Sequence, residues 1–259
     1  MQTARLLIAF LMLTKLWGQD QLPPIPGQTP KNSSASITFK ASYLDTYIFR
    51  GHVFDEEPST QGELTAGISS WSYNLFYSDP SEDTGIGRQE YNHSVSFTMV
   101  AGNRITTTGY RYFDYEDAPD RHDTQEFFYR TAYRTRWNPT YGVAYDFDTY
   151  KGYYVDLSVT RSFPFTQKSE LIFSLYTGFA YDMEEQRGAG RQISEPAFYG
   201  KDGFTHGYAV LNYHWRITRK FKFESAIEYH HLADDFLTNN DTFDDQHVAW
   251  KTSFTLSLP

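Results

Sequence analysis

The chain has 259 residues, a formal net charge of -9 and no cysteine. The lack of cysteine excludes a disulfide scaffold and thiolate metal sites, and the acidic balance argues against nucleic acid, whose phosphates need clustered Lys and Arg. Aromatic residues make up 18 % of the chain, although it is polar on average. A transmembrane β-barrel has this composition, because lipid-facing and lumen-facing residues alternate along each strand.

The N-terminus is typical of a secretory signal peptide. Arg5 precedes an apolar run from Leu6 to Leu13, and a short polar stretch follows, which predicts a signal over 1–18. The alternative is a buried helix. The prolines that follow predict an extended leader over 19–35, and we expect the barrel to occupy 36–259.

From Ser36 onward, apolar and polar residues alternate in pieces of about ten residues separated by turn signals. In the last piece, Val248, Trp250 and Phe254 fall on one face, while Lys251 and Ser253 fall on the other. The pattern predicts an all-β, antiparallel up-and-down barrel of about twelve strands. We place the strands near 36–49, 60–69, 72–78, 90–101, 104–113, 125–137, 141–150, 153–163, 169–182, 204–217, 221–231 and 246–258.

The connections between these strands alternate between long and short. The short ones include Gly102–Asn103, Asn138–Thr140 and Thr218–Lys220. The long ones include His52–Ser59, Ser78–Gln89, Asp114–Thr124, Met183–Gly203 and Leu232–Asp245. Outer-membrane barrels have short periplasmic turns and longer external loops. The rhythm therefore favours this class over the alternative of a soluble sandwich or a lipocalin-like barrel.

Two of the short turns predict a strand register. A three-residue turn at Asn138–Thr140 pairs Trp137 with Tyr141, Tyr133 with Tyr145, and Arg130 with Asp148. The turn at Thr218–Lys220 pairs Trp215 with Phe223, Leu211 with Ile227, and His214 with Glu224. In both hairpins the aromatic and aliphatic pairs then face lipid, where such cross-strand contacts are favourable.

The stretch Tyr47, Ile48, Phe49, Arg50 and Gly51 resembles the opening motif of the TorF-type porins, a family of Gram-negative outer-membrane barrels. Gln61-Gly62, Ala66-Gly67 and Trp71 follow it in a similar arrangement. The resemblance implies an outer-membrane barrel with a transport role and names no substrate. The C-terminus departs from the pattern, because barrels of this kind end in an aromatic residue that the assembly machinery reads, whereas this chain ends Ser257-Leu258-Pro259.

Charged residues on alternate positions are the strongest candidates for a site. An arginine facing lipid at the membrane midplane costs about 2–4 kcal/mol, so these side chains should face the lumen. The candidates for lining or gating the lumen are Arg130, Arg134, Arg136, Asp146, Asp148, Asp156, His214 and Glu224. Opposed charges across a narrow pore sort solutes by charge. The pattern predicts a porin-like channel for small hydrophilic solutes or ions; the alternative is a non-conducting barrel whose paired charges plug the interior.

Acidic residues cluster in the long loops. They are Asp55, Glu56, Glu57, Asp79, Glu82, Asp83, Asp114, Glu116, Asp117, Asp234, Asp235, Asp241, Asp244 and Asp245. Such clusters could hold Ca²⁺ or Mg²⁺ and bridge to lipopolysaccharide, or could be solvated loop charges. No EF-hand spacing occurs, and we predict no resident metal or cofactor. The expected partners are outer-membrane lipid, lipopolysaccharide, the barrel-assembly machinery and small solutes.

Motifs for catalysis are missing from the sequence. His93 and Ser94 are adjacent and therefore point to opposite faces of a strand, and the chain has neither a G-x-S-x-G elbow nor H-E-x-x-H spacing. We therefore predict that the protein is not an enzyme. A barrel hydrolase using His214, Glu224 and Asn212 stays as the alternative.

Overall fold

The computed structural model describes residues 35–55, 57–80, 89–116, 122–183, 199, 202–232 and 246–258. The predicted signal peptide 1–18, nearly all of the leader 19–35, the terminal Pro259 and most of the acidic loop residues lie outside these ranges. Within them, no helix is long and apolar enough to cross a membrane.

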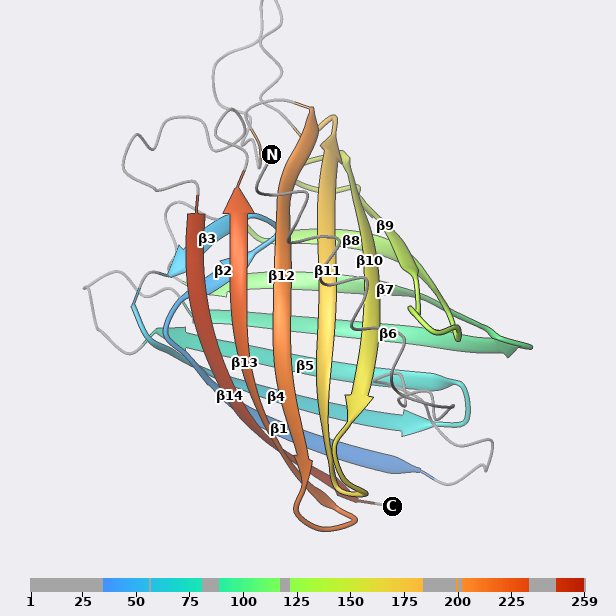
Figure 1. Ribbon diagram of the computed structural model, residues 1–259. Coiled ribbons are helices and arrows are strands. Elements are labelled where there is room, and N and C mark those ends of the chain that lie inside the picture. Colours follow the sequence, from blue (N-terminus) through green and yellow to red (C-terminus); the bar gives the residue numbers. More distant parts are fainter. Residues whose placement is uncertain are drawn as a thin grey trace, which may run out of the picture.

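Twelve antiparallel strands close into one barrel, in which β1 pairs with both β14 and β4 (Figure 1). The barrel strands are β1 (Ser36–Leu44), β4 (Ser59–Ile68), β5 (Trp71–Pro80), β6 (Gln89–Ala101), β7 (Arg104–Glu116), β8 (Thr124–Tyr133), β9 (Thr140–Asp146), β10 (Tyr153–Pro164), β11 (Ser169–Tyr181), β12 (Gly203–Arg216), β13 (Phe221–Leu232) and β14 (Gln246–Leu258). A two-stranded hairpin, β2 (Tyr47–Phe49) and β3 (His52–Asp55), lies outside this order. The predicted fold class and strand number are confirmed.

Alternation along each strand gives the barrel an apolar outer wall and a polar lumen. On β14 the outward residues Val248 and Phe254 are 66 % and 45 % exposed, whereas the inward Ser253 is 3 % exposed. The same pattern on the other strands covers the outer wall with aliphatic and aromatic side chains. An apolar belt of this extent is unfavourable in water and favourable in the hydrocarbon of a bilayer, so the fold is a transmembrane barrel.

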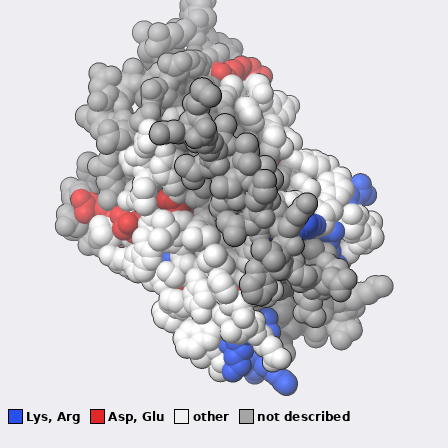
Figure 2. All heavy atoms as spheres, in the orientation of Figure 1, with Lys and Arg blue, Asp and Glu red and all other residues white. Residues whose placement is uncertain are grey.

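The two ends of the barrel differ in their connections and in their charge. Connections of a few residues join β4 to β5, β6 to β7, β8 to β9, β10 to β11, and β12 to β13, all at one end. The β2–β3 hairpin lies at the opposite end (Figure 1). In Figure 2, lysine and arginine side chains gather towards the short turns and acidic side chains towards the other end.

Some strand ends differ from the prediction. The first strand ends at Leu44 instead of residue 49, so the resembling motif forms the separate β2–β3 hairpin. β8 ends at Tyr133 instead of residue 137, and β9 ends at Asp146 instead of residue 150. The predicted extensions assumed that alternation alone carries a strand onward, but polar turn residues interrupt the pairing at each point.

One of the two predicted registers is wrong. Arg130 pairs with Gly142 and not with Asp148, because six residues, 134–139, connect β8 to β9 where three were assumed. The predicted pairs of Trp137 with Tyr141 and of Tyr133 with Tyr145 are therefore also wrong. The register across the Thr218–Lys220 turn is confirmed in all three pairs: Trp215 with Phe223, Leu211 with Ile227, and His214 with Glu224.

Candidate constriction inside the barrel

The β2–β3 hairpin turns through Arg50 and Gly51. Phe49 pairs with His52, and the two residues between them have positive φ angles of 52° and 86°. Two consecutive positive φ values define the tight turn that suits a two-residue hairpin, and glycine is favoured there because it has no Cβ. The resembling motif is therefore a hairpin tip.

This tip crosses the lumen to the opposite wall. The hairpin leaves the barrel between β1 and β4, yet Arg50 donates from Nη2 to both carboxylate oxygens of Glu126 on β8, at 3.0 and 2.7 Å. Tyr199 donates its hydroxyl to the carbonyl oxygen of Arg50 at 2.8 Å. A Cβ on Gly51 would lie 2.9 Å from Nδ1 of His206 on β12. The tip is thus held from several strands of the far wall.

A shared carboxylate dominates the electrostatics at the tip. Arg111 on β7 donates to Glu126 at 3.1 Å, so two guanidinium groups meet one carboxylate. The side chains of Glu126 and Arg50 are only 1 % and 11 % exposed. Burial alone would lower the pKa of Arg50, but the Glu126 carboxylate raises it, and the pKa lies above its ordinary value. The Arg50 guanidinium is therefore charged, and the pair is shielded from solvent.

Aromatic side chains enclose the Arg50 guanidinium. Its carbon lies 4.5 Å from the ring centre of Tyr154 and 5.0 Å from that of Phe49, within the range of cation–π attraction. An apolar cluster supports the base of the hairpin. It consists of Leu44, Tyr47, Phe113 and Tyr115, with Phe49 and Phe76 packed against it. The hairpin is therefore a packed part of the barrel interior.

The second charged group in the lumen joins three neighbouring strands. Arg130 on β8 donates to Asp156 on β10 at 2.7 Å, although β9 lies between them. Gly142 on β9 is the register partner of both residues, and a Cβ there would collide with the Asp156 carboxylate. The missing side chain lets the guanidinium reach across β9. Arg130 is 58 % exposed and Asp156 is 23 % exposed, so the pair faces open lumen.

The third charged group surrounds Glu224 on β13, nearer the short turns. His214 Nε2 lies 2.8 Å from this carboxylate, Lys222 Nζ 2.9 Å and Lys40 Nζ 3.4 Å. His214 also approaches Glu170, with its Nδ1 3.6 Å from the carboxylate. The sequence predicted His214 and Glu224 to meet but did not single out the two lysines, although Lys222 shares the inward face of β13 with Glu224 and Lys40 lies on the inward face of β1. Their alternation with outward residues was the available signal.

The other four predicted site residues lie at a strand end or in the connections between strands. Arg134 and Arg136 follow the end of β8, in the connection to β9, so Arg130 is the one of the three candidate arginines that lies on a strand. Asp146 is buried at the end of β9 and accepts hydrogen bonds from the backbone N–H groups of Tyr150 and other loop residues. Asp148 accepts from Gln125 at 2.9 Å at the rim. Both carboxylates organise the connection to β10.

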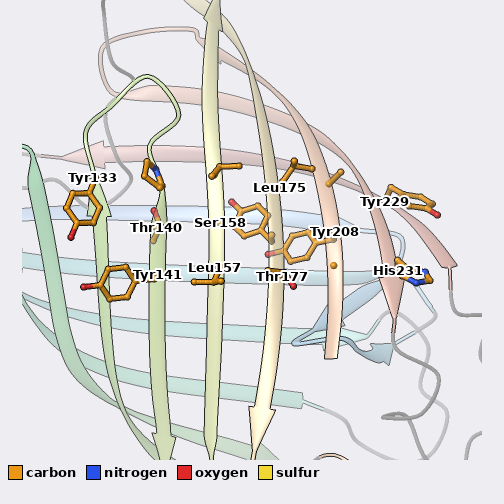
Figure 3. A pocket seen from close by; sticks show the side chains of 15 residues that line it. Tyr133, Thr140, Tyr141, Leu157, Ser158, Leu175, Thr177, Tyr208, Tyr229 and His231 are labelled. Carbon is orange, nitrogen blue, oxygen red and sulfur yellow. The ribbon is translucent and has the colours of Figure 1, made fainter. Parts of the chain in front are cut away.

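Other potential sites are limited. Among the described ranges, no three His, Asp or Glu side chains lie close enough to hold a metal ion. An apolar groove of about 710 Å³ lies over β8 to β13, with Tyr141, Leu157 and Leu175 among its lining residues (Figure 3). These side chains are outward-facing and exposed, so the groove belongs to the lipid-facing wall.

No family model matches the sequence, and no curated protein matches it. Solved structures of porins do match it in fold. The KdgM porin matches with a TM-score of 0.52 at 7 % identity, covering 86 % of this chain and 99 % of that chain. The NanC porin matches with a TM-score of 0.53 at 8 % identity, covering 86 % and 100 %. The COG4313 outer membrane channel from Pseudomonas putida F1 matches with a TM-score of 0.53 at 10 % identity, covering 92 % and 100 %. The chain therefore has the fold of the porin barrels.

Proposed function

We propose that the protein is a narrow channel of the outer membrane for small hydrophilic solutes or ions, and that the β2–β3 hairpin forms its constriction. The observation that carries the proposal is the Arg50 tip, which crosses a charged lumen and binds Glu126 on the far wall. The outer-membrane location, the kinship with the TorF-type porins and the lipid, lipopolysaccharide and assembly partners belong to the same proposal.

The lining of the lumen supports passage of polar solutes. Beside the charged groups, hydroxyl pairs such as Ser72 with Ser96 and Thr160 with Ser174 point inward, with their oxygens 2.8 and 2.9 Å apart. A lumen lined by apolar side chains would exclude water and polar solutes. Inward charges and hydroxyls instead favour water, and they replace part of the hydration of a passing solute.

Charged groups that contain both signs lie at different depths of the lumen. Arg50, Arg111 and Glu126 lie in the half with the long loops, whereas Glu224 and its two lysines lie in the other half. Arg130 faces open lumen between them. We expect Arg130 to act on ion selectivity, and Arg134 and Arg136 to act only at the mouth.

Planar-bilayer recording of the refolded protein tests this function, after heat-modifiable gel migration has shown that the barrel is folded. Discrete conductance steps with a defined reversal potential in a salt gradient are the expected result. A folded barrel that gives no steps, both as the native chain and with Arg50 replaced by Ala, would refute the channel.

The second candidate is a non-conducting barrel, and the buried Arg50–Glu126 pair also favours it, because such a pair is costly to break. In that case the hairpin is a permanent plug and the function rests on the external loops. Removing the long connection between β13 and β14 would separate the two functions. A channel keeps its conductance after this change, whereas a binding barrel loses its partner.

A further inference from the structure

Two stacked tyrosine rings line the lumen between the constriction and the short turns. Tyr176 on β11 and Tyr208 on β12 are register partners, and their ring centres lie 4.4 Å apart with planes 5° from parallel. The stack continues through His206 to Tyr154, whose ring centre is 4.5 Å from the guanidinium carbon of Arg50. Tyr176 and Tyr208 are partly exposed. They therefore form a surface of the lumen beside the constriction.

One face of the Tyr176 ring lies over small side chains. Tyr208 stacks on the face towards β12. On the other side, the register partner of Tyr176 is Ser158 on β10, and the partner of Ser158 on β9 is Thr140. Neighbouring strands lie about 4.8 Å apart, and a serine side chain is too short to cover a tyrosine ring. Tyr176 thus presents a flat aromatic surface next to the hydroxyl groups of Ser158 and Thr140.

An ion pair flanks this surface on the side of the constriction. Asp156 precedes Ser158 by two residues on the inward face of β10, so it is a diagonal neighbour of Tyr176. Diagonal neighbours in a sheet are about 7–8 Å apart, within reach of long side chains. Arg130, which binds Asp156, is 58 % exposed and lies close enough to Tyr176 and Tyr208 for its charge to act on both. A solute on the ring therefore meets donors on Arg130 and acceptors on Asp156.

Hydroxyl groups continue from this surface towards the short turns. Thr160 and Ser174 are the next inward positions on β10 and β11, and their side-chain oxygens lie 2.9 Å apart. Beyond them, the Ser162 hydroxyl donates to the Glu170 carboxylate. The two strands thus present a row of hydrogen-bonding groups along the direction of passage. A solute with several hydroxyl groups can exchange its hydration water for these groups in steps.

The ion pair selects against charged solutes. Arg130 and Asp156 have opposite charges and lie 2.7 Å apart. An anion that approaches Arg130 also approaches Asp156, and a cation at Asp156 also approaches Arg130, so either meets a like charge, which is unfavourable. A neutral hydroxyl group avoids this cost, because it accepts from the guanidinium and donates to the carboxylate. The pair therefore favours a neutral solute rich in hydroxyl groups.

We infer that the site formed by Tyr176, Arg130 and Asp156 binds a pyranose ring of a neutral sugar in the lumen. The C–H face of the sugar packs on the Tyr176 ring, and hydroxyl groups at the sugar's edge bind the ion pair. Thr160 and Ser174 take the hydroxyl groups of a second sugar unit, so the substrate class is a short neutral oligosaccharide. The inference rests on the proposed channel, whose solute it specifies.

Saturation-transfer NMR of the full chain, in a detergent without sugar headgroups, measures binding whether or not the barrel conducts. Maltotriose is the probe, and sorbitol is the comparison because it has hydroxyl groups but no ring. We expect saturation of the ring C–H protons of maltotriose and little transfer to sorbitol. Tyr176→Ala should weaken maltotriose binding about fivefold, as expected for the loss of one aromatic contact. Tyr176→Phe keeps the ring and should retain binding.

Tyr213→Ala is the matched control, because Tyr213 lies on the lipid-facing side of β12 and is 37 % exposed; it should leave binding unchanged. Ser158→Leu provides a second test if Tyr176→Ala fails to fold. It places a larger side chain beside the Tyr176 ring and should abolish binding. Equal saturation of maltotriose and sorbitol by the native protein would overturn the inference. Binding at the native level by Tyr176→Ala or by Ser158→Leu would overturn it as well.

Planar-bilayer recording without sugar separates the sugar site from the channel. Conductance steps in a protein that does not bind maltotriose would overturn the sugar site and leave the channel. Maltotriose binding by a folded barrel that gives no conductance steps would refute the channel and support the sugar site.

Discussion

Replacing Arg50 by Ala should release the hairpin from the far wall of the barrel. The change removes both hydrogen bonds to Glu126 and the contact with the Tyr154 ring. It also leaves a carboxylate that is 1 % exposed with Arg111 as its remaining cation. We therefore expect the hairpin to spend more time out of the lumen and the channel to spend more time in a state of higher conductance.

The size of the effect follows from the burial of the pair. Removing one partner of a buried ion pair costs about 3–5 kcal/mol. Each 1.4 kcal/mol is about a tenfold change in an equilibrium, so the ratio of released to bound hairpin should rise about a hundredfold or more. Arg50→Lys keeps the charge but loses the planar fork, and should give a smaller rise.

Single-channel recording in planar bilayers measures this ratio as the fraction of time spent at the higher conductance. A disulfide between Gly51→Cys and His206→Cys supplies the control, because the native chain has no other thiol. A Cβ on Gly51 would lie 3.0 Å from the Cβ of His206, near the about 3.5–4.5 Å that a disulfide needs. Oxidation should cancel the effect of Arg50→Ala, and a reductant should restore it.

The reasoning would be refuted if Arg50→Ala folded normally and kept the native conductance and occupancy. It would also be refuted if the rise in conductance persisted after oxidation of the cysteine pair, since the hairpin tip would then still be fixed to β12. In either case the hairpin would be a static lining of the channel and not the element that limits its width.

Two further predictions concern the Arg130–Asp156 pair. Gly142→Ala should lower the free energy of unfolding by about 1–3 kcal/mol, because its Cβ would collide with the Asp156 carboxylate. Gly62→Ala is the matched control, since no atom lies within 4 Å of a Cβ at that position. Urea unfolding in vesicles measures both free energies. Arg130→Ala should shift the reversal potential in a KCl gradient towards cation selectivity, because it removes a positive charge from the lumen and leaves the Asp156 carboxyl group without its partner. Arg136→Ala should leave the reversal potential unchanged, and an equal shift in both variants would contradict the assignment.

The barrel could be predicted from the sequence because its rules are local. A period of two sorts residues to lipid or lumen regardless of what the neighbouring strands do, and the last strand was predicted at the residues that β14 occupies. The alternation of short and long connections then indicated a barrel of the transmembrane type. Neither signal needs knowledge of a contact between distant residues, which is why both were reliable here.

The hairpin was missed because its opening residues continue the alternation. The predicted first strand ran to Phe49, but its outward series Ile37, Phe39, Ala41 and Tyr43 would have brought Asp45 to the lipid face. A carboxylate there is unfavourable, and the strand ends just before it. Arg50 and Gly51 between two short apolar runs also match a two-residue turn. These signals could have separated the hairpin, although not its partner Glu126.

The register between β8 and β9 shows why the lumen pairs could not be predicted in the same way. Assuming the shortest turn pairs Arg130 with Asp148, and that pair looks favourable in isolation. In the barrel, the carbonyl oxygen of Trp137 instead accepts a hydrogen bond from the backbone N–H of Thr160 on β10. Trp137 therefore belongs to the connection between β8 and β9, which is longer than assumed, and the register shifts. Arg130 then faces Gly142, and its partner becomes Asp156 one strand further on. The Arg130–Asp156 pair spans β9 at the one register position where β9 carries a glycine, and a Cβ there would occupy the place of the Asp156 carboxylate. The glycine is therefore the residue that makes the pair, and a sequence pattern that ranks charges but ignores glycines cannot find it.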